Sequence, residues 1–258
     1  SADFDTGTLT VEFTANGAAE DSLGVKTTTN VRRSGNNVEY DATGSFSGSE
    51  VVVGTVPASG AGSGLGGQAL VVTFNANCTP AIAQAVLRAI AYSNGSDNPS
   101  TLTRTVRVTV NDGDGNDSNQ PTLDISVTAV NDAPTLTLVS TLGGATEDTQ
   151  FVISYAALAA AANEADIDSG TINFRIEAIS SGALTINGSA VIAGTTIVTS
   201  ADQLEWTPAA NANGNLAAFT VVAHDGSLAS TPAVQVTVSV AAVNDAPTLT
   251  LVSTLGGA

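Results

Sequence analysis

The feature that most constrains this fold is an identical repeat within the second half of the chain. A segment of seventeen residues occurs twice without a change, once as Ala129–Ala145 and again as Ala242–Ala258, and both copies read AVNDAPTLTLVSTLGGA. The offset between the copies is 113 residues (131 to 244), a normal size for one β-sandwich domain. Internal repeats with such a period indicate a tandem array of similar domains. The sequence therefore predicts that a domain begins at each copy.

A shorter, similar motif occurs near the start of the chain and again in its second half. Ala2–Leu9 reads ADFDTGTL, and Ala165–Ile172 reads ADIDSGTI. In the second case the motif follows the repeat by about 35 residues, whereas in the first it already lies at residue 2. We therefore predict a β-sandwich over 1–130 that lacks its first strand and a complete β-sandwich over 131–243. Residues 244–258 are predicted to be the first strand of the next repeat or a donor strand.

Hydrophobic and polar residues alternate in five short segments. These are Thr8–Thr14, Thr103–Thr109, Leu123–Val127, Phe219–Val222 and Val234–Val240. Alternation with a period of two is typical of strands that have one face in a core and the other in water. Clusters of Gly, Asn, Asp and Ser break the runs roughly every ten residues, as in an all-β sandwich. The predicted fold class is therefore all-β.

Two segments depart from this alternation. Residues 81–92 read AIAQAVLRAIAY and follow Thr79 and Pro80, which suit the N-cap and the first turn of a helix. The alanine-rich segment Ala156–Ala162 predicts a second helical turn. We expect each helix to cross between the two sheets of an immunoglobulin-like β-sandwich.

The charge balance excludes several classes of partner. The chain has 24 acidic and 7 basic residues, so its net charge is −17 at pH 7. Nucleic-acid binding requires a basic face, and anionic membrane surfaces would repel this chain, so neither is an expected partner. No apolar run is long enough for membrane insertion. Carboxylates are ligands that Ca²⁺ prefers, so the acidity fits either solubility or calcium binding.

The reactive side chains argue against an enzyme. His224 is the only histidine and Cys78 the only cysteine, so no disulfide can form within the chain. One residue of each kind does not supply a convincing nucleophile and base. We expect His224 to be structural and Cys78 to be a buried small hydrophobic residue. Trp206 is expected to pack in the core or at a sheet edge. Sugar stacking by Trp206 is the alternative, although only 4% of the residues are aromatic.

Several short motifs occur in a fixed order between the two copies of the repeat. They are NDAP, TEDT (Thr146–Thr149), D-x-D (Asp166–Asp168), WTPAANANGN (Trp206–Asn215) and A-x-D-G (Ala223–Gly226). In this order they resemble the cadherin-like tandem repeats of very large bacterial surface adhesins and related exported proteins. The resemblance covers 131–245, and residues 1–130 look like a longer relative through DFDTG, IAYSN and NDGDG. It implies tandem Ig/cadherin-like β-sandwich domains outside the cell or on the bacterial cell surface.

The resemblance also implies a cofactor, Ca²⁺, and its ligands. In the cadherin fold calcium lies between successive domains, held by the first strand, the Asn-Asp linker and the D-x-D and A-x-D motifs. Carried over by position, the ligands of the first junction would be Asn131, Asp132, Asp166, Asp168 and Asp225. Those of the second junction would be Glu147, Asn244 and Asp245, and those at the top of the first domain Asp3, Asp5 and Asp112. The linker is NDAP where animal cadherins have D-x-N-D-N-A-P, which implies fewer or weaker sites.

A further acidic run, Asp112–Asp117, reads DGDGND. It places Asp112, Asp114 and Asn116 at alternate positions, as at the start of a calcium loop. No glutamate follows at the EF-hand spacing and no flanking helices are evident. The run therefore predicts either a separate ion bound with the help of Asp114 or a solvated hairpin turn.

Two functions are compatible with these observations. The first is a non-catalytic structural or adhesive segment of an extracellular bacterial surface protein, rigidified by Ca²⁺ at its junctions. Its partners would be the neighbouring repeat domains of the same protein, and the ligand of any distal adhesive domain is left open. The second is a filament subunit that donates residues 244–258 to the first domain of the next identical subunit. The expected donor strand begins at Thr248, with Leu249, Leu251 and Leu255 on one face.

Overall fold

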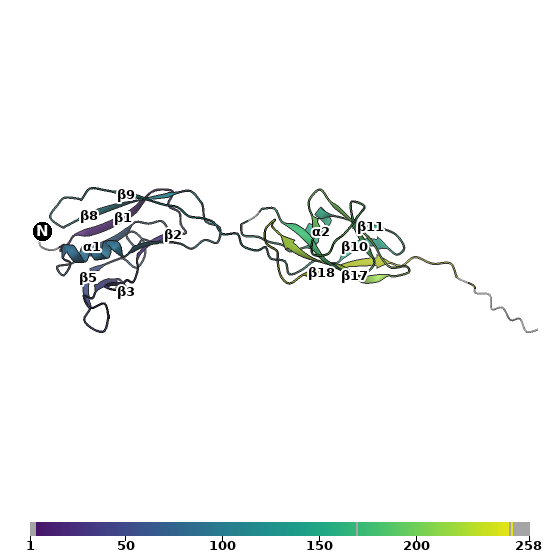
Figure 1. Cartoon of the computed structure of the whole chain (residues 1–258), viewed down its shortest axis with the longest axis horizontal. Coiled ribbons are helices and arrows are strands. Elements are labelled where there is room, and N and C mark those ends of the chain that lie inside the picture. Colours follow the sequence, from purple (N-terminus) through teal and green to yellow (C-terminus); the bar gives the residue numbers. More distant parts are fainter. Residues whose placement is uncertain (1–3, 169, 248, 250–258) are drawn as a thin grey trace, which may run out of the picture. The chain divides into compact units, whose positions relative to one another are not determined.

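The computed structural model describes residues 4–168, 170–247 and 249 of the chain. The chain divides into two compact units, Ser1–Val130 and Asn131–Ala258, each with its own sheets and core (Figure 1). The regular structure consists mainly of β-strands, which confirms the predicted all-β class. Within the described residues, no helix is long and apolar enough to cross a membrane.

Unit 1 contains two sheets. Its strands are β1 (Thr8–Ala15), β2 (Asp21–Val25), β3 (Val31–Ser34), β4 (Asn37–Tyr40), β5 (Val51–Thr55), β6 (Leu70–Phe74), β7 (Ile90–Asn94), β8 (Arg104–Asn111) and β9 (Thr122–Ile125). The larger sheet has the order β3-β4-β5-β6-β1-β8-β9, and β2 pairs with β7 in the smaller one. Strand β9 is therefore an edge of the larger sheet.

Alternation along β1 places one of its faces in the core of unit 1. Leu9 and Val11 are buried, while Thr8 before them and Thr10 between them are half-buried. The two buried side chains belong to one cluster with residues of β6 and with Leu23 of β2. Because the cluster draws on both sheets, unit 1 is the β-sandwich that the alternation predicts.

The predicted helix after Thr79 is present but shorter than expected. Helix α1 (Pro80–Arg88) is capped by the Thr79 hydroxyl, which accepts the backbone N–H of Ile82 at 3.4 Å. The helix connects β6 in one sheet to β7 in the other, as predicted. It does not continue to residue 92, because Ile90–Asn94 pair with β2 instead and form β7. Pairing places part of Ile90 and Tyr92 against the core.

Unit 2 has a similar construction. Its strands are β10 (Leu142–Thr146), β11 (Phe151–Ser154), β12 (Asn173–Ile179), β13 (Ala183–Ile186), β14 (Ser189–Ala190), β15 (Ile197–Val198), β16 (Gln203–Thr207), β17 (Gly214–His224) and β18 (Val234–Ala241). One sheet has the order β10-β18-β17-β12-β15 and the other β11-β16-β13-β14. Strand β10 runs parallel to β18 and forms the edge beyond it. Strand β18 therefore has a neighbour on both sides.

The core of unit 2 surrounds Trp206 of β16. Its side chain is fully buried and packs in one cluster with Phe174 of β12 and Phe219 of β17. The indole N–H donates to the Ser181 carbonyl at 2.8 Å, so its polar atom is also satisfied. Trp206 is thus a core residue, and its ring is not available for stacking on a sugar.

The second helix is also confirmed. Helix α2 (Tyr155–Ala161) begins at Ser154, whose hydroxyl accepts the backbone N–H of Ala157 at 3.1 Å. It connects β11 in one sheet of unit 2 to β12 in the other, so it is the crossover that the alanine-rich segment predicts.

Unit 1 buries an ion pair that the strand pattern does not reveal. The Arg104 Nε lies 3.1 Å from Asp21 Oδ2, and both side chains are inaccessible to solvent. The other carboxylate oxygen of Asp21 accepts hydrogen bonds from Tyr92 Oη at 2.5 Å and Asn94 Nδ2 at 2.7 Å. Arg104 Nη1 donates to the carbonyl of Leu102 at 2.8 Å. These bonds offset part of the cost of removing two charges from water, and Arg104 Nη2 is buried without a hydrogen-bond partner among the described residues.

We expect unit 1 to lose stability between about pH 4 and pH 2. Burial alone raises the pKa of Asp21, but hydrogen bonds from Tyr92, Asn94 and Arg104 outweigh it and lower the pKa from 3.8 to about 2. A carboxyl with a lowered pKa stabilises the fold fully above its unfolded pKa, and the contribution disappears as the pH falls through the folded value. The difference corresponds to about 2 kcal/mol. Urea unfolding of unit 1 at several pH values measures it, and a stability that stays constant from pH 5 to pH 2 would contradict the expectation.

Candidate functional site

The linker at the start of unit 2 lies against two acidic loops of the same unit. The backbone N–H of Asp132 donates to Asp168 Oδ2 at 2.6 Å. The side-chain amide of Asn131 donates to Asp225 Oδ2 at 2.8 Å. Asp166 joins through its own loop, because its Oδ1 accepts the backbone N–H of Asp168 at 2.8 Å. The structure therefore brings together the five residues that the sequence assigned to the first junction. We call them the linker cluster.

The loop after β17 fixes the position of Asp225. Its Oδ1 accepts the backbone N–H groups of Ser227 at 2.6 Å and Leu228 at 2.7 Å, which closes a tight turn. The Asn131 amide and these backbone donors lower the pKa of the Asp225 carboxyl. The group therefore remains an anion well below neutral pH, as a cation ligand must.

The linker cluster contains carboxylate and amide oxygens, which are the type of ligand that a hard cation prefers. Asp168 Oδ1 is buried and has no hydrogen-bond partner among the described residues. An unpaired buried carboxylate oxygen is unfavourable, and a cation would satisfy it. The described residues contain no group of three Asp, Glu, His or Cys side chains arranged to hold a metal ion. Calcium at this position would therefore need amide or backbone carbonyl oxygens in addition to carboxylates.

Glu147, assigned to the second junction, anchors the chain that leaves β18. Its side chain is buried, Oε1 accepts the backbone N–H of Val243 at 2.5 Å, and Oε2 accepts the side-chain amide of Asn213 at 2.9 Å. Val243 directly precedes Asn244 and Asp245, which are exposed. Asn244 donates to the Asp245 carbonyl at 3.4 Å. The structure therefore places Glu147 beside this linker, but its carboxylate contacts backbone and amide N–H groups.

The third set lies at one end of unit 1. Asp3 falls outside the described residues. The loop that contains Asp5 packs against the chain after β8: a Cβ atom at Gly113 would lie 2.3 Å from the Asp5 carbonyl oxygen. Gly113 also has a φ of +91°, which glycine adopts without strain. Asp112 follows Asn111, the last residue of β8, so Asp5 and Asp112 belong to neighbouring segments, as predicted.

The Asp112–Asp117 run forms a turn stabilised by its own side chains. Asp112 Oδ1 accepts the backbone N–H of Asp114 at 3.1 Å. The amide of Asn111 donates to Asp117 Oδ1 at 3.0 Å. Asp114 is exposed. These contacts agree with the hairpin-turn interpretation, and a separate ion at Asp114 stays a prediction.

Two residues near these sets were not among the predicted site residues. Glu164 precedes Asp166 by two positions, its Oε2 is buried without a hydrogen-bond partner among the described residues, and burial raises its pKa. Asn213, which holds Glu147, lies in the WTPAANANGN run. Asn213 carried a signal, because it belongs to a motif named above, but the spacing of that motif does not identify its contact. Glu164 precedes the Ala165–Ile172 segment and belongs to none of the motifs, so no signal in the sequence identifies it.

The histidine and cysteine have structural surroundings. Nδ1 of His224 accepts the backbone N–H of Gly226 at 2.9 Å, within the turn that follows β17. Cys78 is buried, as predicted, and burial raises the pKa of its thiol to about 12. A thiol with this pKa is not a nucleophile at neutral pH.

Comparison with known proteins gives one match to a family. The family model for a cadherin-like domain matches residues 130–241, which run from the last residue of unit 1 to the end of β18 in unit 2. A search of curated proteins found no match.

Two solved structures show a distant likeness. The S-layer protein SbsC domains 4 and 5 are 16% identical with a TM-score of 0.25, covering 53% of this chain and 65% of that chain. The fibronectin(III)-like modules of Clostridium thermocellum CbhA are 16% identical with a TM-score of 0.23, covering 90% of this chain and 94% of that chain. Likeness at this level does not bear on function.

Proposed function

We propose that this chain is a non-catalytic structural or adhesive segment of an extracellular bacterial surface protein, in which Ca²⁺ stiffens the junctions between repeat domains. The observation that carries the proposal is the linker cluster, which forms at the start of a unit that matches the cadherin-like family. The partners are the neighbouring repeat domains of the same protein. The net charge of −17 agrees with an exported acidic protein that binds neither nucleic acid nor anionic membranes.

The residues of the linker cluster would divide the work of binding. Asp225 and Asp168 would supply negative charge. Oδ1 of Asp168, which has no hydrogen-bond partner among the described residues, would be available to coordinate the ion. Asn131 now turns its NH₂ group toward Asp225, and a half-turn of the amide would present its oxygen instead. Calcium bound there would neutralise carboxylates that otherwise repel each other, and it would fix the linker backbone through Asn131 and Asp132. Asp166 would support the loop that holds Asp168.

The other two acidic sets would extend the same principle. Glu147 with Asn244 and Asp245 would act at the next junction, and Asp5 with Asp112 and Asp3 at the start of unit 1. In each case carboxylates from one domain would meet a linker, and loss of calcium would allow the linker to bend.

We expect Ca²⁺ to raise the melting temperature of unit 2. A ligand at about one hundred times its dissociation constant adds about 2.7 kcal/mol. For a domain of about 110 residues, 1 kcal/mol shifts the melting temperature by about 4 °C, so the expected rise is roughly 10 °C. Calorimetry in millimolar Ca²⁺ and in EDTA measures the shift. Asp166→Asn combined with Asp168→Asn should abolish it.

Glu177→Gln is the matched control for this experiment. Glu177 lies on β12 of the same unit and pairs with Arg175 at 2.6 Å, so its loss removes one negative charge outside the linker cluster. The control should keep the full calcium response. Equal melting temperatures in Ca²⁺ and EDTA for the unaltered chain would refute the calcium proposal.

A second function has one specific observation in its favour. In the larger sheet of unit 1, no described strand lies beyond β9, whereas β10 covers the corresponding edge of β18 in unit 2. An open strand edge is a template for another chain. Subunits that fill this edge in one another, head to tail, would form an extracellular filament.

A further inference from the structure

A groove crosses the outer face of the smaller sheet in unit 1. The buried residues of β2 alternate with Ser22 and Gly24, which therefore face outward. On β7, Ser93 lies opposite Ser22 and Ala91 lies opposite Gly24, so four small side chains form the floor of the groove. The hollow above this floor has a volume of about 210 Å³. A Cβ atom at Gly24 would meet no atom within 4 Å, so the space above the floor is open.

A loop packed against β2 forms one wall of the groove. The backbone N–H of Leu23 donates to the Gly64 carbonyl at 2.7 Å. The backbone N–H of Gly67 donates to the Asp21 carbonyl at 2.8 Å. The packing is so close that a Cβ atom at Gly64 would lie 2.1 Å from the Leu23 carbonyl oxygen. Leu65 of this loop lines the groove and is 48% exposed. The wall is therefore a fixed part of the fold and presents an apolar side chain.

Two basic residues line the same hollow. Lys26 directly follows β2, and Arg33 lies on β3. The guanidinium of Arg33 is positioned by two backbone carbonyls, because Nε donates to Gly35 at 2.9 Å and Nη2 donates to Pro57 at 3.0 Å. These carbonyls carry no net charge, so the guanidinium is held in place without being neutralised. We call the hollow with its floor, its wall, Lys26 and Arg33 the cationic groove.

Positive charge without a partner is uncommon in this chain, which has 24 acidic and 7 basic residues. Four of the basic residues form ion pairs with carboxylates: Arg32, Arg104, Arg107 and Arg175. Within the part of the chain that the structure describes, Lys26 and Arg33 form no ion pair, and no acidic side chain lines the cationic groove. A hollow lined by charges of one sign concentrates the electrostatic potential. The cationic groove therefore fits an anion.

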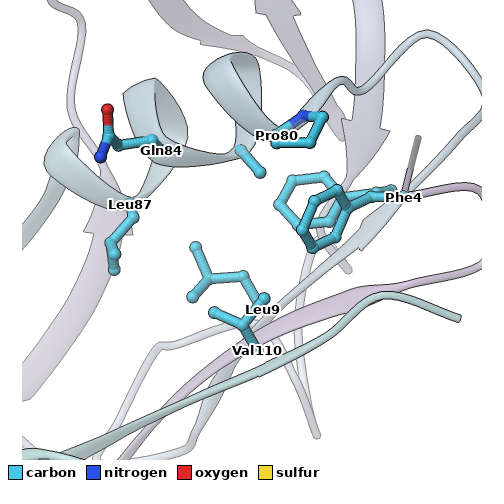
Figure 2. Close-up of a pocket in the computed structure, with 8 residues that line it drawn as sticks. Phe4, Leu9, Pro80, Gln84, Leu87 and Val110 are labelled. Atoms are coloured by element: carbon cyan, nitrogen blue, oxygen red, sulfur yellow. The ribbon is translucent and has the colours of Figure 1, made fainter. Parts of the chain in front are cut away.

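Two other hollows of unit 1 lack this combination. The hollow below helix α1, of about 190 Å³, is lined by side chains that include Leu9, Leu87 and Val110, and none of its lining residues is charged (Figure 2). The lining of another hollow includes Asp112 and Asp117, which would repel an anion. The attraction expected for an anion is thus a property of the cationic groove and not of every hollow in the unit.

The cationic groove offers three kinds of surface that together match a carboxylated sugar. Ammonium and guanidinium groups bind carboxylates through charge-assisted hydrogen bonds. The hydroxyls of Ser22 and Ser93 on the floor can donate to and accept from sugar hydroxyls. Leu65 offers an apolar surface to the C–H groups of a sugar ring. Because the side chains of the floor are small, a flat ring can lie on them.

We propose that the cationic groove binds an acidic polysaccharide, with the carboxylate of a uronic acid held by Lys26 and Arg33 and its ring on the floor. This binding function goes beyond the structural role proposed above and does not involve calcium. A second copy of this chain fits less well, because two chains with a net charge of −17 repel each other. An acidic peptide fits less well, because it has no ring to cover the small residues of the floor.

Calorimetric titration of the full chain with an oligogalacturonate, and separately with an oligomannuronate, tests the proposal. The titrations are made in EDTA, which removes any calcium that could bridge carboxylates. The methyl ester of each oligosaccharide is the matched ligand, because it keeps the rings and loses the charge. We expect at least one of the acids to bind, and its ester to bind about tenfold more weakly or worse. Binding of neither acid would overturn the proposal, as would equal affinity for acid and ester.

A polyglutamate of equal charge tests the alternative partner. It should bind more weakly than the oligosaccharide, because it makes only the contacts with Lys26 and Arg33. Equal or tighter binding of the polyglutamate would refute the assignment to a polysaccharide and identify an acidic peptide as the partner.

Substitutions of the basic residues locate the contact. Lys26→Gln and Arg33→Gln should each weaken binding of the acid by about tenfold, because each removes a charge-assisted contact. Arg88→Gln is the matched control, since Arg88 is exposed at the end of α1 and lies outside the lining of the groove. This control removes the same charge and should leave the affinity unchanged. Equal losses in all three variants would mean that overall charge determines binding, which contradicts the proposal.

Gly24→Val tests the floor without changing any charge. Valine suits a strand, and a Cβ atom at this position meets no atom within 4 Å, so unit 1 should melt normally. The valine side chain would occupy the space where the ring lies, and we expect binding of the acid to fall by about tenfold or more. A Gly24→Val chain that melts normally and binds with unchanged affinity would show that the ligand does not lie on the floor, and the assignment would be wrong.

Discussion

Arg104→Met should destabilise unit 1 by about 3–5 kcal/mol, because it leaves a buried carboxylate without its counter-charge. Arg104 and Asp21 are both fully buried, and their charged atoms are 3.1 Å apart. Methionine retains much of the aliphatic volume of arginine, so the loss reports mainly the charge. Asp21 would keep its hydrogen bonds from Tyr92 and Asn94, but these neutral donors do not replace a guanidinium.

Calorimetry of the whole chain gives this experiment an internal control. The two units have separate cores, so the melting transition of unit 1 should fall while that of unit 2 remains unchanged. Adding Asp21→Asn to Arg104→Met should recover part of the lost stability, because the uncompensated charge is then removed. If Arg104→Met alone changes the unit 1 transition by less than about 1 kcal/mol, the pair is not the buried charge pair described above.

The sequence predicts the strands better than the contacts between distant side chains. Alternation identifies β1, β8 and β18 because each has one face in a core and one in water. The end of α1 is missed, since residues 89–92 are compatible with a helix until pairing with β2 decides otherwise. The pairing of Asp21 with Arg104 spans 83 residues. Its formation depends on two sheets meeting, and no local spacing encodes that.

In the candidate site, too, the participating residues are easier to predict than the individual side-chain contacts. The resemblance to cadherin-like repeats assigns Asn131, Asp132 and Asp225 to one site, and the structure places Asn131 against Asp225 and Asp132 against Asp168. The contact between Glu147 and Asn213 is not predictable in this way, although both residues lie in recognised motifs. Hydrogen bonds of single side chains depend on loop conformation at a scale that sequence spacing does not resolve.

Trp206→Ala should destabilise unit 2 by about 3–5 kcal/mol, because it opens a cavity in the middle of the core. Trp206 is the largest fully buried side chain among the described residues and contacts both sheets through Phe174, Phe219 and their neighbours. The tightly paired strands around it, β11 and β13 on either side of β16, cannot collapse into the space without breaking their ladders. The melting transition of unit 2 should therefore move to a much lower temperature, while that of unit 1 stays in place.

Comparing Trp206→Phe with Trp206→Ala distinguishes the cost of the cavity from the cost of the lost hydrogen bond. Phenylalanine fills part of the volume but leaves the Ser181 carbonyl without the indole N–H that it accepts at 2.8 Å, so the loss should be smaller than for alanine. Both variants should leave binding to polysaccharides unchanged, since the ring lies inside the core. A Trp206→Ala chain that melts normally but loses affinity on a glycan array would reverse this assignment, because it would require the ring to be at the surface.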